Sequence, residues 1–311
     1  MMQLLVCALL GAAIGSASSS LDAGAPAQKV ILDTDIGDDV DDAYALTLLA
    51  SMPGVKLLGV TTTFGQTAER AQIAAKLLQR LGKPEIPVCA GRRGPSAIGT
   101  QYAWAQGFAS RAIQREDAVE FMRRQIEANP GEVTLIAIGP LVNLGDLLTR
   151  HPEVKAHIRQ IVIMGGAVYQ GYDGGKPTAE WNIRCDPAAA KVVFQSGVPL
   201  TMAGLEATAM LKLEADRLKR LYSYGTPATD ALAALTYLWG RTTPVLYDPM
   251  AVAYGTGHVF CRTEHQHVEV EDDGTTRITP GTPNVTVLVD PRKDEFLDWY
   301  VSAVGMQTGG R

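Results

Sequence analysis

Short apolar runs alternate with helical patterns along the first half of the chain. The apolar runs have the length and composition of buried strands, at Val30–Leu32, Val55–Thr63, Ile86–Cys89, Val133–Ile138 and Ile161–Met164. Residues between them show the apolar spacing of helices, at Asp41–Ala50, Ala68–Leu81 and Glu116–Ala128. Strands that alternate with helices are typical of a parallel sheet with helices on both faces. The pattern therefore predicts an α/β domain with a mostly parallel central sheet flanked by helices.

The rest of the chain has more helical patterns than apolar runs. Asp186 and Pro187 have the residue types that begin a helix. Further helices are predicted at Ala215–Tyr222, Pro227–Gly240, Pro249–Tyr254 and Asp294–Val304, and a last strand at Asn284–Val289. The polar stretch His265–Thr282 predicts an exposed hairpin. Because no repeat, low-complexity block or linker interrupts the pattern, we expect one domain over residues 28–311.

The first 27 residues form a separate segment. Leu4–Ile14 is an apolar run, and the small residues of Gly15–Ser20 follow it. The run is short for a membrane span but fits the apolar part of a signal peptide, although no Lys or Arg precedes it. We therefore expect residues 1–27 to be a signal peptide and flexible leader, and the protein to be secreted or periplasmic.

Charge and cysteine content narrow the class of partner. The formal net charge is −5, and no cluster of Lys and Arg stands out. Because nucleic acids and anionic membranes attract clustered cations, we expect neither as a partner and favour a small-molecule substrate. Outside the leader, Cys89, Cys185 and Cys261 are scattered and form no CxxC pair. This pattern predicts buried thiols rather than disulfides or a zinc site.

An acidic cluster between Asp33 and Asp42 is the strongest chemical signal in the sequence. Six aspartates fall within these ten residues, directly after a predicted buried strand. Open α/β sheets bind ligands at this end of their strands. Carboxylates so close together repel one another, and a hard cation with oxygen ligands, Ca²⁺ or Mg²⁺, relieves the repulsion. Gly37 allows a sharp turn, Asp41 begins the next helix, and Asp38 is interpreted as a helix cap or a solvent-facing residue.

Other motifs accompany this cluster. They are Ile138–Asn143, Met164–Gly166, Glu180–Asn182, Asp186-Pro187 and Asp248–Val252. Together with Asp33–Gly37 and Asp41–Ala43, these blocks resemble the inosine-uridine nucleoside hydrolase family, in the family's order, from about Lys29 to the last helix. The resemblance implies a single-domain nucleoside-hydrolase-like fold and hydrolysis of the N-glycosidic bond of ribonucleosides to ribose and free base. It also leads us to expect a homo-oligomer, either a dimer or a tetramer.

The resemblance further implies roles for individual residues. Asp35 would be the general base and a calcium ligand, and the other ligands would be Asp42, Asp248 and the carbonyl oxygen of Ile138. The ribose would contact Asp41, Glu180, Asn182 and, from the turn after the second strand, Gln66. The aspartate motif has two more residues here than the shorter form in the family, so Asp39 could take over one role.

These assignments agree with the chemistry of glycosidic cleavage. The reaction passes through an oxocarbenium-like state, so carboxylates around the sugar stabilise the developing positive charge. A calcium ion can bind the attacking water and lower its pKa, and it can also orient the ribose hydroxyls. Asp35 can then accept the proton of that water.

Two aromatic residues are candidates for contact with the base. Tyr247 stands directly before Asp248, where much of the family has a histidine that can protonate the leaving base. A phenol with a pKa of about 10 is a poorer proton donor at neutral pH than an imidazolium, and Tyr247 could instead pack against the pocket wall. Trp181 could stack on the base or belong to the core. Asp248 followed by Pro249 also fits an ordinary helix N-cap.

Two other functions fit parts of the sequence. A phosphatase of the haloacid-dehalogenase type also has DxD after its first strand, with Asp33 as nucleophile and Mg²⁺ as cofactor. However, Gly37 stands where that class has Thr or Val, and no convincing later Lys and acidic motif follow. A non-catalytic ribose- or nucleoside-binding protein could have the same pocket, although the intact Asp35 argues against it. Phosphate release would favour the phosphatase, and a turnover assay separates an enzyme from a binding protein.

Overall fold

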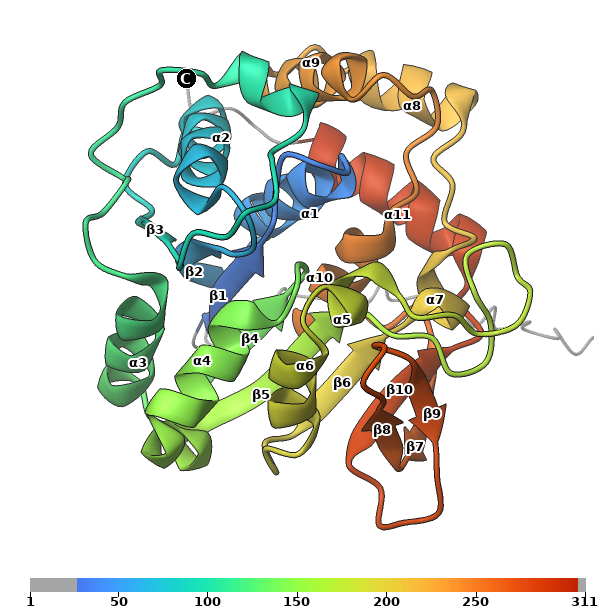
Figure 1. Ribbon diagram of the computed structural model, residues 1–311. Helices are drawn as coiled ribbons and strands as arrows, with labels where there is room; N and C mark the ends of the chain where they lie inside the picture. Colours follow the sequence, from blue (N-terminus) through green and yellow to red (C-terminus); the bar gives the residue numbers. More distant parts are fainter. Residues whose placement is uncertain (1–26, 307–311) are drawn as a thin grey trace, which may run out of the picture.

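The computed structural model describes residues 27–306, and its centre is an eight-stranded sheet in the order β3-β2-β1-β4-β5-β6-β10-β7 (Figure 1). Seven strands are parallel: β1 (Gln28–Thr34), β2 (Val55–Thr62), β3 (Val88–Ala90), β4 (Val133–Ala137), β5 (Ile158–Met164), β6 (Leu200–Ala203) and β10 (Val285–Val289). The edge strand β7 (Arg262–Gln266) pairs antiparallel to β10. The mostly parallel central sheet is therefore confirmed.

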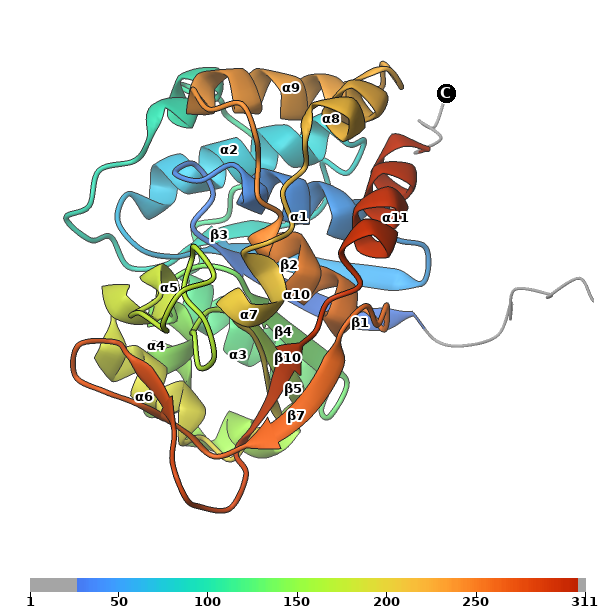
Figure 2. The ribbon, with the colours of Figure 1, turned by 90° about the vertical axis from the view of Figure 1, so that its right-hand side faces the viewer.

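Helices cover both faces of this sheet (Figures 1 and 2). On one face, α1 (Asp41–Ser51), α2 (Thr67–Arg80) and α10 (Tyr247–Gly255) pack against the strands. Outside them, α8 (Ala215–Tyr222), α9 (Pro227–Trp239) and α11 (Lys293–Gly305) pack on other helices and extend the same apolar core. The other face packs against α3 (Ala118–Ala128), α4 (Val142–Arg150) and α6 (Pro187–Phe194). The short helices η1 (Thr100–Trp104), η2 (Pro152–His157), α5 (Trp181–Cys185) and α7 (Leu205–Thr208) lie in the connections.

Strand β1 shows why the apolar runs are continuous rather than alternating. Val30 and Leu32 enter the core on one face, and Ile31 enters the core on the other, because successive side chains of a strand point to opposite sides. All three are at most 1% exposed. A strand buried on both faces needs apolar residues at every position, which is the pattern that predicted a parallel sheet.

Many predicted elements differ from the structure at their ends, as three examples show. Helix α3 begins at Ala118, because the side chain of Asp117 accepts a hydrogen bond from the Val119 N–H at 3.0 Å and caps it. Helix α10 begins at Tyr247, so Asp248 lies in its first turn, and the N-cap interpretation of Asp248 is wrong. The predicted hairpin is shorter, because residues up to Gln266 belong to β7; β8 (Val268–Val270) and β9 (Thr276–Ile278) form a separate two-stranded sheet.

Two other predictions concern the chain start and the cysteines. Residues 1–26, nearly the whole predicted signal peptide and leader, lie outside the described residues. Between residues 27 and 306, no helix is both long and apolar enough to cross a membrane. Cys89 and Cys261 are buried thiols as predicted, whereas Cys185 is free but only partly buried.

The carboxyl ends of the central strands meet at one edge of the sheet. Asp33 of β1 pairs in register with Thr61 of β2 and with Ala137 of β4. The loops that follow these three strands therefore leave the sheet side by side. Ile163 of β5 is in turn level with Ala137, which brings the segment after β5 to the same edge.

Candidate active site

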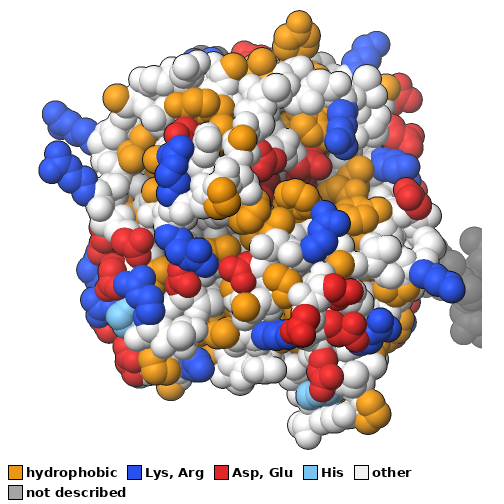
Figure 3. Space-filling view, in the orientation of Figure 1, with side chains coloured by type: hydrophobic (Ala, Val, Ile, Leu, Met, Phe, Trp, Pro, Cys, Tyr) orange, Lys and Arg blue, Asp and Glu red, His pale blue; other side chains and the backbone are white. Residues whose placement is uncertain are grey.

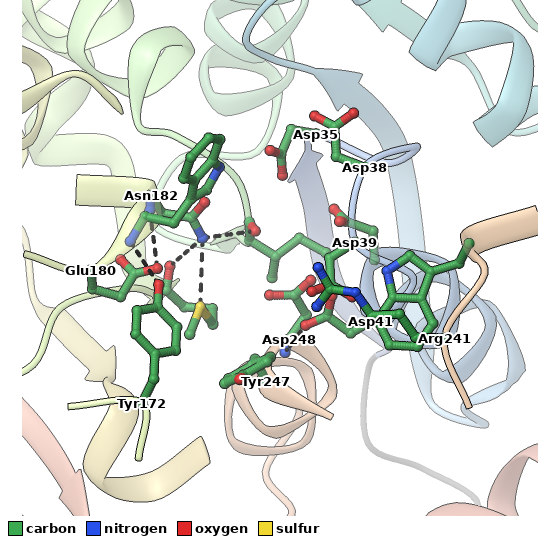
Figure 4. A pocket seen from close by; sticks show the side chains of 15 residues that line it. Asp35, Asp38, Asp39, Asp41, Tyr172, Glu180, Asn182, Arg241, Tyr247 and Asp248 are labelled. Carbon is green, nitrogen blue, oxygen red and sulfur yellow. Dashed lines mark hydrogen bonds between the residues drawn. The ribbon is translucent and has the colours of Figure 1, made fainter. Parts of the chain in front are cut away.

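A cavity of about 380 Å³ opens at this edge (Figure 4), a size suited to a small molecule. Ten of the eleven predicted site residues line it: Asp35, Asp39, Asp41, Asp42, Ile138, Glu180, Trp181, Asn182, Tyr247 and Asp248. Gln66 is not among the lining residues; it directly precedes α2 and is half-buried. The space-filling view shows acidic side chains recessed near the centre of one face, beside hydrophobic ones (Figure 3).

Three buried carboxylates form a group in this cavity. Oxygen atoms of Asp41, Asp42 and Asp248 all lie within 4.8 Å of one another. Burial raises the pKa of each carboxyl group well above its usual range, and the neighbouring carboxylates raise it further. Asp41 and Asp42 begin α1, and Asp248 lies in the first turn of α10, so the partial positive charge of two helix N-termini faces them.

Asp35 lies beside this group, closer to Asp38 in Figure 4. It is 5% exposed, and burial raises its pKa to about 7, although the charge of Arg70 opposes this shift. Gly139 explains how the β4 loop comes so close: a Cβ atom at this position would lie 2.7 Å from Asp35 Oδ1. Gly37 turns the chain after Asp35 with a φ of +124°, as its predicted role in a sharp turn requires.

The segment after β5 places Glu180 and Asn182 on the opposite wall. Glu180 is the N-cap of α5 and accepts hydrogen bonds from the N–H groups of Gly166, Asn182 and Ile183 at 3.0, 3.0 and 3.2 Å. The Asn182 amide nitrogen donates to the carbonyl oxygens of Ile138 and Met164 at 3.0 and 3.1 Å. Both side chains are buried and held in a single orientation.

The sequence of this chain also matches a known protein family. The family model described as inosine-uridine preferring nucleoside hydrolase matches residues 30–298. The chain belongs to this family. As a nucleoside hydrolase, it is an N-glycosyl hydrolase that acts on nucleosides.

Individual relatives agree with this membership. The pyrimidine-specific ribonucleoside hydrolase RihA of Salmonella arizonae is 33% identical over 304 residues, which cover 88% of this chain and 96% of that protein. The structure of a purine-preferring ribonucleoside hydrolase from Gardnerella vaginalis is 26% identical, with a TM-score of 0.78 over 89% of this chain and 98% of that one. The plant nucleoside hydrolase PpNRh1, at 24% identity, shares the fold with a TM-score of 0.81 over 90% of this chain and 100% of its own.

In this nucleoside hydrolase, the side chain of Asp33 is buried and hydrogen-bonded to neighbouring side chains. Its Oδ1 accepts hydrogen bonds from Thr61 Oγ1 at 2.6 Å and from Asn143 Nδ2 at 2.8 Å. It is 1% exposed, and burial raises its pKa to about 7. Because Asp33 is not among the residues that line the cavity, it is poorly placed to be a phosphatase nucleophile. This placement and the family both favour the nucleoside hydrolase over the phosphatase.

Aromatic side chains form the outer part of the cavity. Trp181 is 44% exposed, so the core interpretation of this residue is wrong. The Tyr172 and Tyr247 rings pack edge to face, with centroids 6.2 Å apart. Burial raises the pKa of the Tyr247 phenol, and the nearby Asp41 and Asp39 carboxylates raise it further. Tyr247 therefore holds its proton more firmly than an ordinary tyrosine.

Five residues of the site had no role assigned to them from the sequence, and a sixth, Asp38, was misinterpreted. Met164, Tyr172, Trp239 and Arg241 line the cavity, and Arg70 lies behind Asp35. Asp38 neither caps α1 nor simply faces solvent, because it forms an ion pair with Arg70 at 2.7 Å. One signal was available: Arg70 is a lone cation on the buried face of α2, among apolar residues. Trp239 and Arg241 lie at the end of α9 and after it, where the sequence has no distinguishing pattern.

Proposed function

We propose that this nucleoside hydrolase releases ribose and free base from ribonucleosides, with Asp35 as general base and Ca²⁺ as cofactor. The observation that carries the proposal is the group of three buried carboxylates at the wall of a nucleoside-sized cavity. Asp42 and Asp248 would hold the ion, together with Asp35 and the carbonyl oxygen of Ile138.

The residues present fit a hard divalent cation. The donors are oxygen atoms alone, which Ca²⁺ and Mg²⁺ prefer. Burial and mutual repulsion oppose ionisation of the three carboxyl groups. Their ionised form becomes favourable when a bound cation compensates its charge. Calcium accepts six to eight oxygen ligands, so it leaves room for substrate oxygens beside the protein donors. When bound, the ion would supply a Lewis acid that lowers the pKa of water and orients the ribose hydroxyls.

The proton of the attacking water passes to Asp35 in this account. Its carboxylate lines the cavity and lies against Gly139, where a larger residue would displace it. A buried carboxylate has few competing partners and accepts a proton more readily than an exposed one. Asp35 thus generates the nucleophile next to the anomeric carbon.

The opposite wall would bind the ribose and stabilise its developing positive charge. Glu180 is anchored by three backbone N–H groups, which fix its carboxylate without neutralising it. The amide nitrogen of Asn182 donates hydrogen bonds to two carbonyl oxygens, so its amide oxygen remains available to accept a hydrogen bond from a ribose hydroxyl. Asp41 would contact a hydroxyl from the metal side, and Asp39 lines the cavity next to it. Fixed negative groups favour an oxocarbenium-like state over the neutral ground state.

The leaving base would lie against the aromatic part of the cavity. Trp181 presents an exposed ring there, which can stack on either a purine or a pyrimidine. Tyr247 is the proposed proton donor, and its raised pKa makes it a weak one. We therefore infer that stacking and good leaving groups matter more than acid catalysis.

A substrate panel tests the proposed function. Purified protein is incubated with inosine, adenosine, uridine and cytidine, with and without a calcium chelator, and released ribose is measured. The RihA relative is described as pyrimidine-specific and the Gardnerella enzyme as purine-preferring, so both classes belong in the panel. Ribose release that the chelator abolishes supports the proposal. Phosphate release from a phosphomonoester without ribose release from any nucleoside would overturn it.

Two further proposals rest on the sequence and the resemblance. A secreted or periplasmic protein would start between Ser18 and Ala27, and N-terminal sequencing of native material tests this; an intact Met1 would contradict export. Light scattering on purified protein tests the expected dimer or tetramer, which a monomer would contradict.

A further inference from the structure

Arg70 is the largest side chain that is fully buried in the described part of the chain. It lies in the first turn of α2 and directs its guanidinium to the loops after β1 and β2, next to the backbone of Asp35. Nε donates to the carbonyl oxygen of Phe64 at 2.8 Å, and Nη1 donates to the carbonyl oxygens of Asp35 and Ile36. Nη2 donates to Asp38 Oδ2 at 2.7 Å. All three nitrogens are thus used, three of the four bonds go to backbone, and all four go to the loops after β1 and β2.

The β1–α1 loop depends on side chains from elsewhere for its shape. Asp38, already paired with Arg70, accepts a second hydrogen bond from the Gly99 N–H at 2.8 Å. Gln101 Nε2 donates to the carbonyl oxygens of Asp38 and Asp39 at 3.2 and 2.8 Å. Arg70 and Asp38 together therefore hold the turn that starts at Asp35.

The same guanidinium also holds the loop after β2. Phe64 has a φ of +59°, a left-handed conformation that is unfavourable for a bulky residue and needs support from its surroundings. The Arg70 bond to its carbonyl oxygen supplies part of this support. The Phe64 ring meets Trp181 edge to face, with centroids 6.4 Å apart. One buried cation thus connects Asp35 with the aromatic part of the cavity.

We propose that Arg70, with Asp38, is a positioning residue that fixes the Asp35 turn relative to the Phe64 loop, and so sets the general base against the sugar and base of the bound nucleoside. The inference rests on the proposed role of Asp35. Arg70 contacts neither Glu180 nor Asn182 in any recorded hydrogen bond, and these residues are held by the backbone on the opposite wall. Loss of Arg70 should therefore affect the chemical step more than ribose binding.

The test compares Arg70→Lys, Asp38→Asn and the double variant with wild type. Arg80→Gln, an exposed position at the end of the same helix, is the matched control. For each protein, kcat and KM for the best nucleoside, the melting temperature and the Ca²⁺ affinity by titration calorimetry are measured. Asp35→Asn provides the reference for loss of the base itself. All assays run well below the lowest melting temperature.

We expect Arg70→Lys to lower kcat about 10- to 100-fold and to weaken Ca²⁺ binding, as is common when a side chain that orients a metal-site residue is changed. KM should change much less. Because Arg70 and Asp38 act as a pair, the double variant should be no worse than Arg70→Lys alone. Arg80→Gln should match wild type in all four measurements.

A lower melting temperature with wild-type kcat in Arg70→Lys would overturn the inference, because the residue would then serve stability alone. The inference would also be overturned if Arg70→Lys changed kcat and KM by equal factors, or if the effects of the two single variants were fully additive in the double variant. If Arg70→Lys does not fold, Asp38→Asn decides: it must lower kcat and leave KM unchanged. If the wild-type protein releases no ribose, the proposed function is wrong. If Asp35→Asn is inactive while Arg70→Lys is fully active, only the role proposed for Arg70 is wrong.

Discussion

The backbone N–H of Asp248 donates to Oδ2 of Asp41 at 3.3 Å, although 207 residues separate the two in the sequence. This bond joins the N-terminal turns of α10 and α1. The contact places two helix N-termini against the same set of carboxylates, which offsets part of their repulsion. The remaining repulsion is the physical reason to expect a divalent cation at this point.

Removal of the metal should abolish activity and lower stability. Protein stripped with a chelator should lose turnover and regain it when Ca²⁺ is added back. Its melting temperature should also fall, because an ion that binds the folded state alone stabilises that state. Activity assays and thermal melts, with metal content from elemental analysis, check both points. Full activity in protein shown to be metal-free would contradict the calcium proposal.

The part of the site that can be predicted from the sequence lies at the end of β1 and its neighbouring strands. The continuous apolar run of β1 indicates a central parallel strand, and the edge where such strands end is the usual ligand site, so Asp35 and Asp41 could be placed from the sequence. Asp248 needed the resemblance, since Asp-Pro alone also fits a helix N-cap. In the structure α10 starts one residue before Asp248, which turns its carboxylate toward α1 instead of to its own backbone.

Other parts of the site depend on tertiary packing that local patterns do not encode. Trp239 and Arg241 reach the cavity because α9 packs against η1, α2 and α1, contacts between segments that are distant in the sequence. Arg70 lies at a position with the spacing of the buried face of α2. A cation at such a position indicates a role in the site only when its hydrogen-bond partners are known, and the sequence does not give them. Gln66 was expected at the ribose, but it is placed before the first turn of α2 and outside the cavity lining.

Tyr247→Phe should slow inosine hydrolysis more than hydrolysis of p-nitrophenyl riboside. The nitrophenolate leaves without a proton, whereas a nucleobase benefits from one, so removal of the phenolic O–H should affect the nucleoside selectively. Because Tyr247 is a weak acid, the loss on inosine should be modest, on the order of tenfold, below the usual range for general acid catalysis. Steady-state kcat/KM on both substrates gives the comparison.

The control for this variant is Tyr237→Phe, since Tyr237 lies on α9 and is 85% exposed. It should behave like wild type on both substrates. Equal slowing of inosine and the nitrophenyl riboside by Tyr247→Phe, or no slowing of either, would show that Tyr247 is not the proton donor.

We expect stability to depend on pH through Glu206, a buried residue that is not one of the proposed metal ligands. It lies on α7, and its Oε2 accepts a hydrogen bond from the Val168 N–H at 3.2 Å, while Oε1 has no hydrogen-bond partner among residues 27–306. Burial raises its pKa from 4.5 to about 7. The folded state then binds more protons than the unfolded state between these values, so stability falls as pH rises from about 4.5 to 7.

Glu206→Gln should remove this cost, which is on the order of 3 kcal/mol for a shift of that size. Relative to wild type, the variant should therefore gain stability between pH 5 and pH 8. Chemical denaturation at several pH values, with Ca²⁺ present throughout, measures the difference. The exposed Glu85→Gln is the control and should show the wild-type pH profile. A Glu206→Gln profile parallel to wild type would contradict the raised pKa.

Turnover by Asp35→Asn tests the proposed mechanism, because Asp35 is proposed both to accept the proton of the water and to bind the metal. The variant is purified, its fold is checked by circular dichroism, and its metal content is measured at saturating Ca²⁺. Ribose release from the best nucleoside is then compared with wild type. We expect a folded protein whose kcat is lower by several orders of magnitude, since the base and a ligand charge are removed together. A folded, metal-loaded variant with near-normal kcat would contradict it.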